Sequence, residues 1–466
     1  MQTHYDFIAI GGGSAGFNAA RAATRFAQRV ALIDGAKELG GLCILRGCMP
    51  SKTLIYVADV LHHARHGATL GLDIPSAAAN MPAVHARKRR IIGEFADYRR
   101  QQLESGKFAV LRANAHFVGP NRLELSDGSL VTADRILIGT GSRVSWPLVP
   151  GLRESKPWTS DDVLELDFVP ESVIVLGGGV VACELAQFLA RMGTRVTQIQ
   201  RSEHILKENS AEASTAVARA LRADGIELFS CTRLDQVAFD GSEFTVTFRH
   251  EGAEVERRAR HCLNALGRDP DTSALGLAAA GIECKPTGHI RTNEFQQTTN
   301  PAVYAAGDCA GPHEIVHVAI QQAEVAVRHA FGQPSEPVDY STLLSVVFTD
   351  PQLATVGPTQ PQLDLAGTSY LAASYPFDDH GKSILMEASI GHVKVLAEPG
   401  SGRLLGAEIV GRDAGELIHI FSVALSAKLT VHDMLRAPWY HPTLAEIITY
   451  PLEEIADRLA EGRTPV

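Results

Sequence analysis

The 466-residue sequence lacks an excess of positive charge, a long apolar run and a set of cysteines that could all pair. Its 53 acidic residues outnumber its 43 lysines and arginines, and the formal net charge of −10 argues against nucleic acid and anionic membranes as partners. No apolar run approaches the roughly 20 residues that cross a bilayer. The seven cysteines are an odd number, so a full disulfide framework cannot form, which favours a reducing compartment.

The beginning of the chain has no room for a secretion signal before an apolar run at residues 5–10. With no leader and no apolar span, we expect a cytoplasmic protein without a membrane partner. A hydrophobic content of 45% and a charged content of 21% are those of an ordinary soluble globular protein. The length suggests roughly three domains.

A glycine-rich turn follows the first apolar run. Residues 11–16 read Gly-Gly-Gly-Ser-Ala-Gly, between a predicted strand at 5–10 and an alanine-rich predicted helix at 18–27. A second predicted strand, at 29–33, ends in Asp34. This is the GxGxxG pattern in the order of strand, turn and helix that dinucleotide-binding folds require.

Each residue of this motif has a physical role. Gly11 makes the tight turn, Gly13 lets the backbone approach a pyrophosphate, and Gly16 lets the helix pack closely on the strand. The helix N-terminus attracts the phosphates with free N–H groups and its dipole. Asp34 is placed to accept hydrogen bonds from a ribose.

The motif occurs a second time. A predicted strand at 172–176 leads into Gly177-Gly178-Gly179-Val180-Val181-Ala182, and the next predicted strand covers 195–200. The interval from the first glycine to the end of the second strand is the same in both copies (34 − 11 = 200 − 177 = 23). The sequence therefore predicts two dinucleotide sites.

The second site ends in Gln200-Arg201 instead of an acid. An acid favours the ribose 2′-hydroxyl of NAD, whereas a nearby arginine accommodates the 2′-phosphate of NADP. Arg201 and Lys207 are the candidates for this phosphate, so NADP(H) is the preferred cofactor and NAD(H) the alternative. Both side chains could also be ordinary solvated surface charges.

Cys43 and Cys48 are separated by four residues and follow the first nucleotide motif. Pro50 restricts the chain after them, and Lys52 brings a positive charge that favours a thiolate. A pair that cycles between dithiol and disulfide fits this setting better than two packing cysteines. A zinc site is disfavoured because no second Cys/His cluster has ligand spacing.

The segment 40–52 resembles the redox-active disulfide of the flavin-dependent pyridine nucleotide-disulfide oxidoreductases, the family of dihydrolipoamide dehydrogenase and glutathione reductase. Segments 133–142, 264–270 and 303–308 are also similar to the family, and in the last of these an aspartate, here Asp308, binds the ribityl or adjoining phosphate region. The resemblance implies that FAD is bound, that Cys48 faces the flavin and that Cys43 exchanges with the substrate.

The resemblance implies an α/β fold with two Rossmann-like dinucleotide-binding domains, for FAD and NAD(P), and a C-terminal α+β dimerisation domain. The expected limits are 1–147 with 266–340 for the FAD domain, 148–265 for the NAD(P) domain and 341–466 for the dimerisation domain. The residues expected to bind the two nucleotides are Gly11, Gly13, Ser14, Gly16, Asp34, Lys52, Thr140, Gly141, Asp308, Gly177, Gly179, Ala182, Gln200, Arg201, Lys207 and Gly267.

A third catalytic element is expected near the C-terminus, where His441 precedes Pro442 and Glu446 follows. Disulfide exchange needs a base for the attacking thiol and an acid for the departing one, and a histidine oriented by a carboxylate supplies both. The competing interpretation is a capping box from Thr443 to Glu446. The resemblance implies a His441–Glu446 pair that acts across a homodimer interface.

Lys52 is expected by resemblance to lie near the flavin ring and to pair with Glu184. The alternative for Glu184 is a solvent-facing acid on a helix. No metal ligand set is expected.

The substrate is expected to be a small disulfide or dithiol, with a dihydrolipoamide dehydrogenase-like enzyme as first choice. A glutathione reductase-like enzyme is the first alternative. Ser14 and Arg21 match positions that contact glutathione in that enzyme, but Glu324 and Arg99 stand where it has an arginine and a tyrosine. A mercuric reductase-like enzyme is a second alternative, although the last cysteine is Cys309 and that enzyme needs a C-terminal cysteine pair. A flavoprotein redox sensor is a third.

Overall fold

The structure is a computed structural model, and it describes residues 3–462. The chain divides into two compact units. Unit 1 comprises residues 1–53, 82–145 and 267–338, and unit 2 comprises residues 54–81, 146–266 and 339–466. The finer domain limits expected from the sequence remain predictions.

Unit 1 contains a seven-stranded sheet whose central strands are parallel. Strands β3, β2, β1 and β6 lie in this order, β16 also pairs with β6, and β5 and β4 continue the sheet in antiparallel fashion. The strands are β1 (Thr3–Ile10), β2 (Val30–Ile33), β3 (Ala109–Leu111), β4 (Ala115–Gly119), β5 (Arg122–Leu125), β6 (Leu130–Ile138) and β16 (Val303–Ala305). The apolar runs of β2 and β16 are buried at every residue, because both faces of a parallel sheet are covered.

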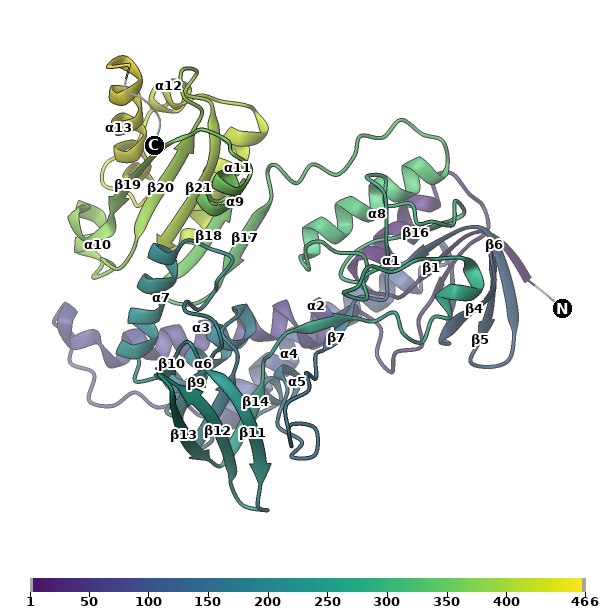
Figure 1. Ribbon diagram of the computed structural model, residues 1–466, viewed down its shortest axis with the longest axis horizontal. Helices are drawn as coiled ribbons and strands as arrows, with labels where there is room; N and C mark the ends of the chain where they lie inside the picture. Colours follow the sequence, from purple (N-terminus) through teal and green to yellow (C-terminus); the bar gives the residue numbers. More distant parts are fainter. Residues whose placement is uncertain (1–2, 463–466) are drawn as a thin grey trace. The chain divides into compact units, whose positions relative to one another are not determined.

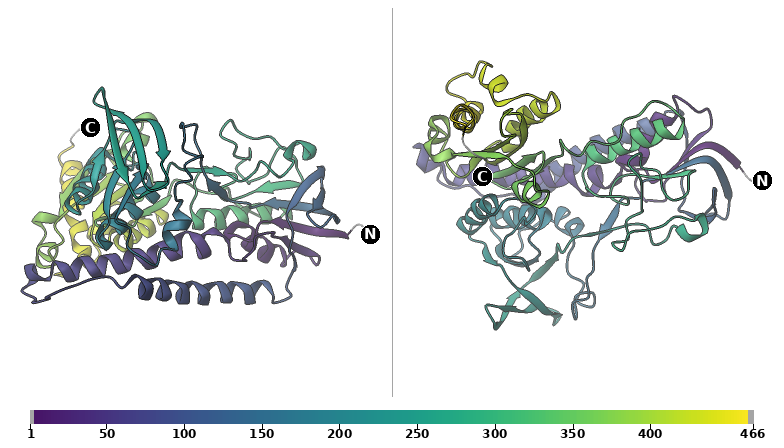
Figure 2. Two further views of the ribbon diagram at one scale, coloured as in Figure 1. Left: turned by 90° about the horizontal axis from the view of Figure 1, so that it is seen from below. Right: turned by 45° about the horizontal axis from the view of Figure 1, so that its top comes forward.

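Two helices, α1 (Ser14–Ala23) and α8 (Val316–Ala330), lie side by side on one face of this sheet (Figures 1 and 2). Their contact is made largely by alanines, whose small side chains let the helix axes approach closely. Helix α1 starts at Ser14, immediately after the glycine turn, and ends before the predicted limit of residue 27. It ends early because Asp6 accepts hydrogen bonds from the backbone N–H groups of Gln28 and Arg29, which bends the chain into β2.

The remaining elements of unit 1 are helical segments and two short strands. They are α2 (Gly41–Arg46), the start of α3 (Cys48–Arg65), α4 (Met81–Leu103) from its second residue, β7 (Ser142–Val144), β15 (Arg268–Pro270) and η2 (Leu277–Ala280).

Unit 2 contains the second parallel sheet, in the order β10, β9, β8 and β14, together with the antiparallel sheet β11–β12–β13. The strands are β8 (Ser172–Leu176), β9 (Arg195–Ile199), β10 (Glu227–Phe229), β11 (Arg233–Phe239), β12 (Phe244–His250), β13 (Ala253–Ala259) and β14 (His261–Asn264). The helical segments of this part are η1 (Gly67–Leu70), α5 (Ser160–Leu164), α6 (Val180–Met192) and α7 (Ala211–Ala223).

The C-terminal part of unit 2 is an antiparallel sheet in the order β17, β18, β21, β20 and β19, packed with α11 and α13 (Figure 1). Its strands are β17 (Leu344–Val347), β18 (Gln352–Val356), β19 (Leu371–Pro376), β20 (His392–Ala397) and β21 (Leu404–Gly411). Its helical segments are α9 (Gln360–Leu365), η3 (Phe377–Asp379), α10 (Gly381–Leu385), α11 (Ala414–Ser426), α12 (Val431–Leu435), η4 (Ala445–Ile448) and α13 (Thr449–Ala460). The α/β fold with two Rossmann-like domains and a C-terminal α+β domain is confirmed.

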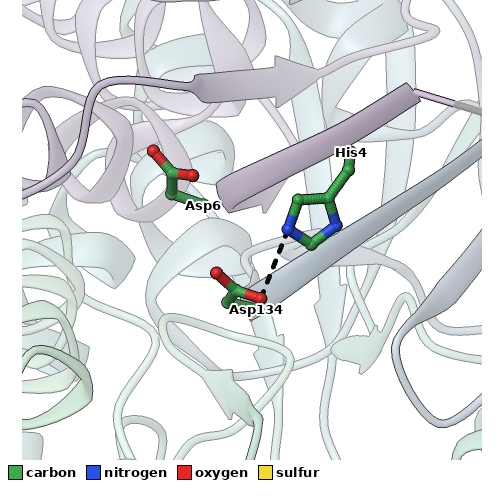
Figure 3. A group of neighbouring side chains, drawn as sticks. All are labelled: His4, Asp6 and Asp134. Atoms are coloured by element: carbon green, nitrogen blue, oxygen red, sulfur yellow. Dashed lines mark ion pairs between the residues drawn. The ribbon is translucent and has the colours of Figure 1, made fainter.

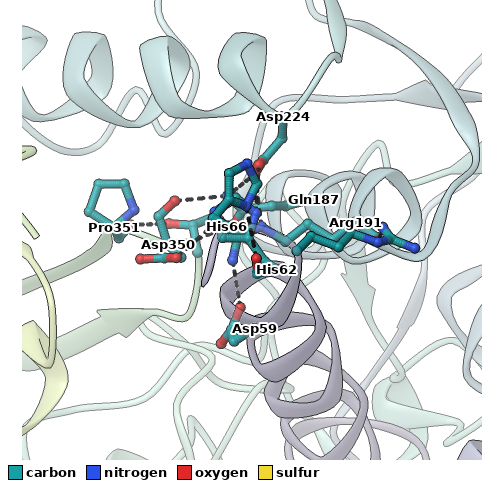
Figure 4. Close-up of polar contacts among 10 residues, drawn as sticks. Asp59, His62, His66, Gln187, Arg191, Asp224, Asp350 and Pro351 are labelled. Atoms are coloured by element: carbon teal, nitrogen blue, oxygen red, sulfur yellow. Dashed lines mark hydrogen bonds and ion pairs between the residues drawn. The ribbon is translucent and has the colours of Figure 1, made fainter. Parts of the chain in front are cut away.

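Arg191 on α6 is a buried charge that joins three separate segments of unit 2 (Figure 4). Its side chain is 4% exposed, and its guanidinium lies 2.8 Å from Asp59 Oδ1, 2.9 Å from Asp224 Oδ2 and 3.0 Å from Asp350 Oδ2. Gln187, one turn earlier, donates to Asp224 and accepts from the backbone N–H of Asp350. Only arginine presents enough donors, in a fixed planar fork, to serve three carboxylates at once.

Burial sets the protonation of the groups around this arginine. It raises the pKa of Asp59 to about 6, against the opposing effect of Arg191. Burial, and then the charge of Arg191, lower the pKa of His62 to about 4. His62 is therefore neutral at pH 7, and Arg191 supplies the positive charge of the cluster.

We expect Arg191→Met to lower the free energy of unfolding by about 3–5 kcal/mol, because the change leaves buried carboxylates without their donor. The measurement is the urea midpoint of the variant against that of the native chain. Arg195→Met is the matched control, since its side chain is 71% exposed. A control of this kind changes stability by about 0.5 kcal/mol or less, and an equal, small effect of both changes would contradict the role of Arg191.

Candidate active site

The glycine turn of unit 1 has two positions that only glycine can fill. Gly11 has a φ of +101°, and a Cβ on Gly16 would lie 1.8 Å from the carbonyl oxygen of Gly11. Gly13 differs, because a Cβ there would meet no atom nearer than Gly41 Cα, at 3.9 Å. Packing within the protein therefore does not require glycine at position 13, and the open space lies at the N-terminus of α1, where a phosphate would bind.

The acid at the end of β2 lies beside this turn. Asp34 Oδ2 accepts a hydrogen bond from the backbone N–H of Gly12 at 3.0 Å, and Oδ1 accepts one from Ala36 at 2.8 Å. This is the placement that the sequence predicts for a ribose-binding acid. The open glycine, the helix N-terminus and the acid together fit a dinucleotide such as FAD.

Asp308 follows β16 and accepts a hydrogen bond from Ser142 Oγ at 2.6 Å. It does not cap α8, whose N-cap is Ile315. Thr140 and Gly141 follow β6 in the same unit, and their N–H groups lie close enough to Cys309 to affect its thiol. These residues come from two strands that pair in the sheet, at the same strand ends as the glycine turn.

The second nucleotide motif repeats this geometry in unit 2. Gly177 has a φ of +126°, and a Cβ on it would lie 2.3 Å from the carbonyl oxygen of Ala265. A Cβ on Gly179 would meet nothing within 4 Å. Ala182 is fully buried at the start of α6, at the position of the third glycine.

Gln200 occupies the place of the acid in this second motif. Its side chain is 6% exposed and packs against Gly178, and Oε1 accepts from the backbone N–H of Ser202. Arg201 and Lys207 are both exposed. Lys207 lies 3.5 Å from Glu208, in a pair that is itself exposed.

The two cysteines lie at the junction of α2 and α3. Cys43 is partly buried on α2, and Cys48 is the exposed first residue of α3. A hydrogen bond with Cys48, together with burial, raises the pKa of Cys43, while the charge of Lys52 acts in the opposite direction. Cys48, and Lys52 one turn further along α3, are therefore close enough to act on the Cys43 thiol.

His441 and Glu446 form a direct pair. Both carboxylate oxygens of Glu446 lie 3.0 Å from His441 Nδ1. The imidazole is 79% exposed, whereas the carboxylate is 13% exposed. Nδ1 is thus held by a partly buried acid, and Nε2 is left to reach a reacting group.

The capping-box interpretation accounts for only part of this segment. The Thr443 hydroxyl accepts from the backbone N–H of Glu446 at 3.3 Å, as a cap requires. In a full capping box the Glu446 carboxylate would return to the N–H of Thr443. Here it turns to His441 instead.

Comparison with known proteins identifies the family. Residues 5–330 match the model of the pyridine nucleotide-disulphide oxidoreductases, and residues 343–451 match the dimerisation domain of these enzymes. The chain belongs to the pyridine nucleotide-disulphide oxidoreductase family. Members of this family use FAD and a pyridine nucleotide.

Individual relatives in this oxidoreductase family carry different activities. The chain is 31% identical to mercuric reductase of Lysinibacillus sphaericus, over 96% of this chain and 81% of the relative. It is 30% identical to dihydrolipoyl dehydrogenase of Bacillus subtilis, over 94% and 96%. The identities are too similar to select one substrate.

Solved structures agree with the fold. LpdA from Mycobacterium tuberculosis superposes with a TM-score of 0.87 at 27% identity, covering 97% of this chain and 99% of LpdA. The HOCl-induced flavoprotein disulfide reductase RclA from Escherichia coli gives a TM-score of 0.85, covering 96% of this chain and 99% of RclA. At 23% identity, the second likeness bears on the fold alone.

Glu184 of this oxidoreductase is not the solvent-facing acid that the alternative interpretation requires. It is 4% exposed, and Oε1 accepts from the backbone N–H of Phe348 at 2.9 Å. Glu184 lies in unit 2 and Lys52 in unit 1. Their pairing remains a prediction.

His4, Asp6 and Asp134 form a small cluster on β1 and β6 (Figure 3). His4 Nε2 lies 3.3 Å from Asp134 Oδ1. The Asp6 carboxylate is already engaged by Arg29, whose backbone N–H is the largest influence that lowers its pKa. The cluster ties β1 to its neighbours in the sheet.

Across residues 3–462, no helix is long and apolar enough to cross a membrane.

His380 is a residue near the pair that sequence reasoning did not find. It lies 3.5 Å from Glu446 but is distant from it in the chain, and no motif marks it. Only the packing of η3 and α10 against the C-terminal segment brings it there.

Alanine substitutions at Gly13 and Gly179 test the two nucleotide sites separately. We expect Gly13→Ala to fold but to lose FAD affinity by about tenfold or more, which corresponds to ~1.4 kcal/mol, because the new methyl group fills the phosphate cradle. Gly179→Ala should keep its flavin and raise KM for the pyridine nucleotide. Flavin content and steady-state kinetics measure the two effects, and each variant is the control for the other. Unchanged flavin in Gly13→Ala would contradict this placement of FAD.

Proposed function

We propose that this oxidoreductase reduces a small disulfide with electrons from NADPH, with a dihydrolipoamide dehydrogenase-like activity as first choice. The observation that carries the proposal is the His441–Glu446 pair, in which a partly buried carboxylate holds Nδ1 of an exposed imidazole. This arrangement fixes the tautomer and leaves Nε2 to move a proton. Cys43 and Cys48 supply the thiols on which such a base would act.

The residues of the chain perform the following exchange in this proposal. The Cys43 thiolate attacks one sulfur of the substrate, the substrate S–S bond breaks, and His441 gives its proton to the departing thiolate. His441 then takes the proton of the Cys48 thiol, Cys48 attacks Cys43, and the S–S bond between Cys43 and the substrate breaks. His441 returns the proton to the second substrate thiolate as the Cys43–Cys48 disulfide forms. Bound FAD supplies the transfer of two electrons from the pyridine nucleotide to this disulfide.

NADPH is proposed over NADH because of the end of β9. The acid that would bind the 2′-hydroxyl of NAD is absent, and Gln200 is turned inward to its own turn. Arg201, which follows it, is exposed and positively charged. A guanidinium binds a phosphate through paired hydrogen bonds, so this side chain suits the 2′-phosphate of NADP.

An uncharged dithiol substrate requires the fewest charged binding groups from this site. Glu324 is exposed on α8 at the position where glutathione reductase has an arginine, so a carboxylate-bearing substrate loses an attraction there. Mercuric ion is the second candidate substrate, because some relatives of this chain are mercuric reductases. Turnover of lipoamide, oxidised glutathione and mercuric ion by one preparation distinguishes the three, and lipoamide should be fastest.

The match of residues 343–451 to a dimerisation domain supports a homodimer as the working form. We further propose that the His441–Glu446 pair of one subunit serves the thiols of the other. A reducing cytoplasm would suit thiols that must cycle.

Cys43→Ser should abolish lipoamide reduction and leave the oxidation of NADPH by oxygen or a quinone, because the electrons still reach the flavin. Absorbance of NADPH and release of thiols are followed in the same assay. Cys231→Ser is the control, since Cys231 is exposed and lies outside the thiol pair. Retained lipoamide turnover in Cys43→Ser would disprove the assignment.

Arg201→Ala should raise KM for NADPH by about tenfold, because a charge-assisted contact is worth roughly 1.5–3 kcal/mol, and should leave KM for NADH nearly unchanged. Arg195→Ala removes the same charge from the opposite end of β9 and controls for the overall field. Equal losses with both nucleotides would show that Arg201 does not bind the 2′-phosphate.

A further inference from the structure

A second, fully buried histidine lies behind the His441–Glu446 pair. The His380 side chain is 1% exposed, and its Nε2 lies 3.5 Å from Glu446 Oε1. Its Nδ1 lies 2.8 Å from Ser383 Oγ. Among the described residues, Nε2 has no hydrogen-bond partner of good geometry, and the Glu446 carboxylate is the acid that lies within ion-pair distance of it.

The surroundings fix which ring nitrogen of His380 carries the proton. A lone pair on Nε2 would face a carboxylate and repel it, so the proton is on Nε2. Nδ1 then accepts from the Ser383 hydroxyl. Burial lowers the pKa of His380, and the imidazole is therefore neutral at pH 7. It presents an N–H to Glu446 without adding a full charge.

The position of His380 is held by aromatic packing. The Tyr450 ring is edge-on to the imidazole, with ring centres 6.3 Å apart and planes at 77°. Tyr450 in turn stacks on Tyr375, at 4.1 Å and 8°. The Tyr375 hydroxyl donates to Asp379, the residue before His380, at 2.9 Å. A ring confined in this way can hold a neighbouring side chain in one orientation.

Glu446 needs such a support. Its carboxylate is 13% exposed, so few waters can compensate for the burial of its charge. His441 is 79% exposed, so surrounding side chains hold it less than they hold His380, which is 1% exposed. A second donor from the rigid side would limit rotation of the carboxylate.

We propose that His380 is a positioning residue for the acid/base pair, and that its Nε2–H holds the Glu446 carboxylate in the orientation that binds His441 Nδ1. The chain of contacts runs from Ser383 through His380 and Glu446 to His441. The inference rests on the proposed function, in which His441 moves the proton in disulfide exchange. It adds a residue that never touches the substrate but determines how much of the time the pair is assembled.

Three substitutions test the role. His380→Leu removes the N–H at similar volume, and His380→Gln returns an amide N–H to the place of Nε2. Ser383→Ala removes the partner of Nδ1 and lets the ring change tautomer. His392→Leu is the matched control, because His392 is buried in the same unit and pairs with Glu408 at 3.2 Å, away from Glu446.

The first readout is steady-state turnover of NADPH with lipoamide. His380→Leu should lower kcat about tenfold, a fraction of the contribution that a general acid/base makes, with KM for NADPH and the rate of flavin reduction unchanged. His380→Gln should recover most of the loss, Ser383→Ala should lose about threefold, and His392→Leu should behave as the native chain. Equal kcat in the native chain and His380→Leu would overturn the proposal.

The second readout needs no substrate. Diethyl pyrocarbonate modifies exposed imidazoles, and peptide mass spectrometry follows the rate at His441 alone. That rate should fall in His380→Leu, return in His380→Gln and stay constant in His392→Leu. An unchanged rate in His380→Leu would overturn the inference. If the native protein reduced its flavin but turned over no disulfide, the proposed function would fail while the modification rates still decided the role of His380.

Discussion

The structure depends on the tight glycine turn between a buried parallel strand and the helix that follows it, which is present in each unit. At Gly11 and Gly177, the first glycine of each turn, φ is positive and a Cβ would lie 2.4 Å and 2.3 Å from the backbone carbonyl oxygens of Gly139 and Ala265. The constraint is steric, so it holds whether or not a ligand is bound. Gly13 and Gly179, the N-caps of the two helices, lie beside open space, and the protein's own packing does not require glycine there.

Burial of charge is the second theme, and it has two outcomes. Around Arg191 three carboxylates share one guanidinium, and the cluster joins α3, the C-cap of α7 and the segment before β18 to α6 within unit 2. Glu446 is only partly buried, and its neighbours are two imidazoles, one exposed and one buried. The first arrangement stabilises the fold, whereas the second keeps a proton acceptor available.

The C-terminal segment shows how one residue can satisfy two local rules and follow only one of them. Thr443 forms half of a cap with the backbone of Glu446. The carboxylate leaves the other half unmade and binds His441, because the imidazole offers a donor at 3.0 Å on both oxygens. The incomplete cap stabilises the helix start less, but it leaves the Glu446 carboxylate oriented toward His441.

The sequence by itself determined the features that depend on residues close together in the chain. Both nucleotide motifs, the acid after β2, the Cys43–Cys48 pair and the fold class could be predicted, because turn geometry and strand–helix order are set by local spacing. Strands β18 and β19 of the C-terminal α+β domain were not predicted. Their limits are fixed by neighbours from elsewhere in the sheet.

Only the tertiary structure decided which distant side chains meet. Glu184 has a solvent-facing alternative in the sequence, but in the structure it is buried and accepts a hydrogen bond from the backbone N–H of Phe348. His380 carries no local signal at all, since its partner is a carboxylate far along the chain. Contacts of this kind arise from the packing of whole elements, and no spacing within the sequence encodes them.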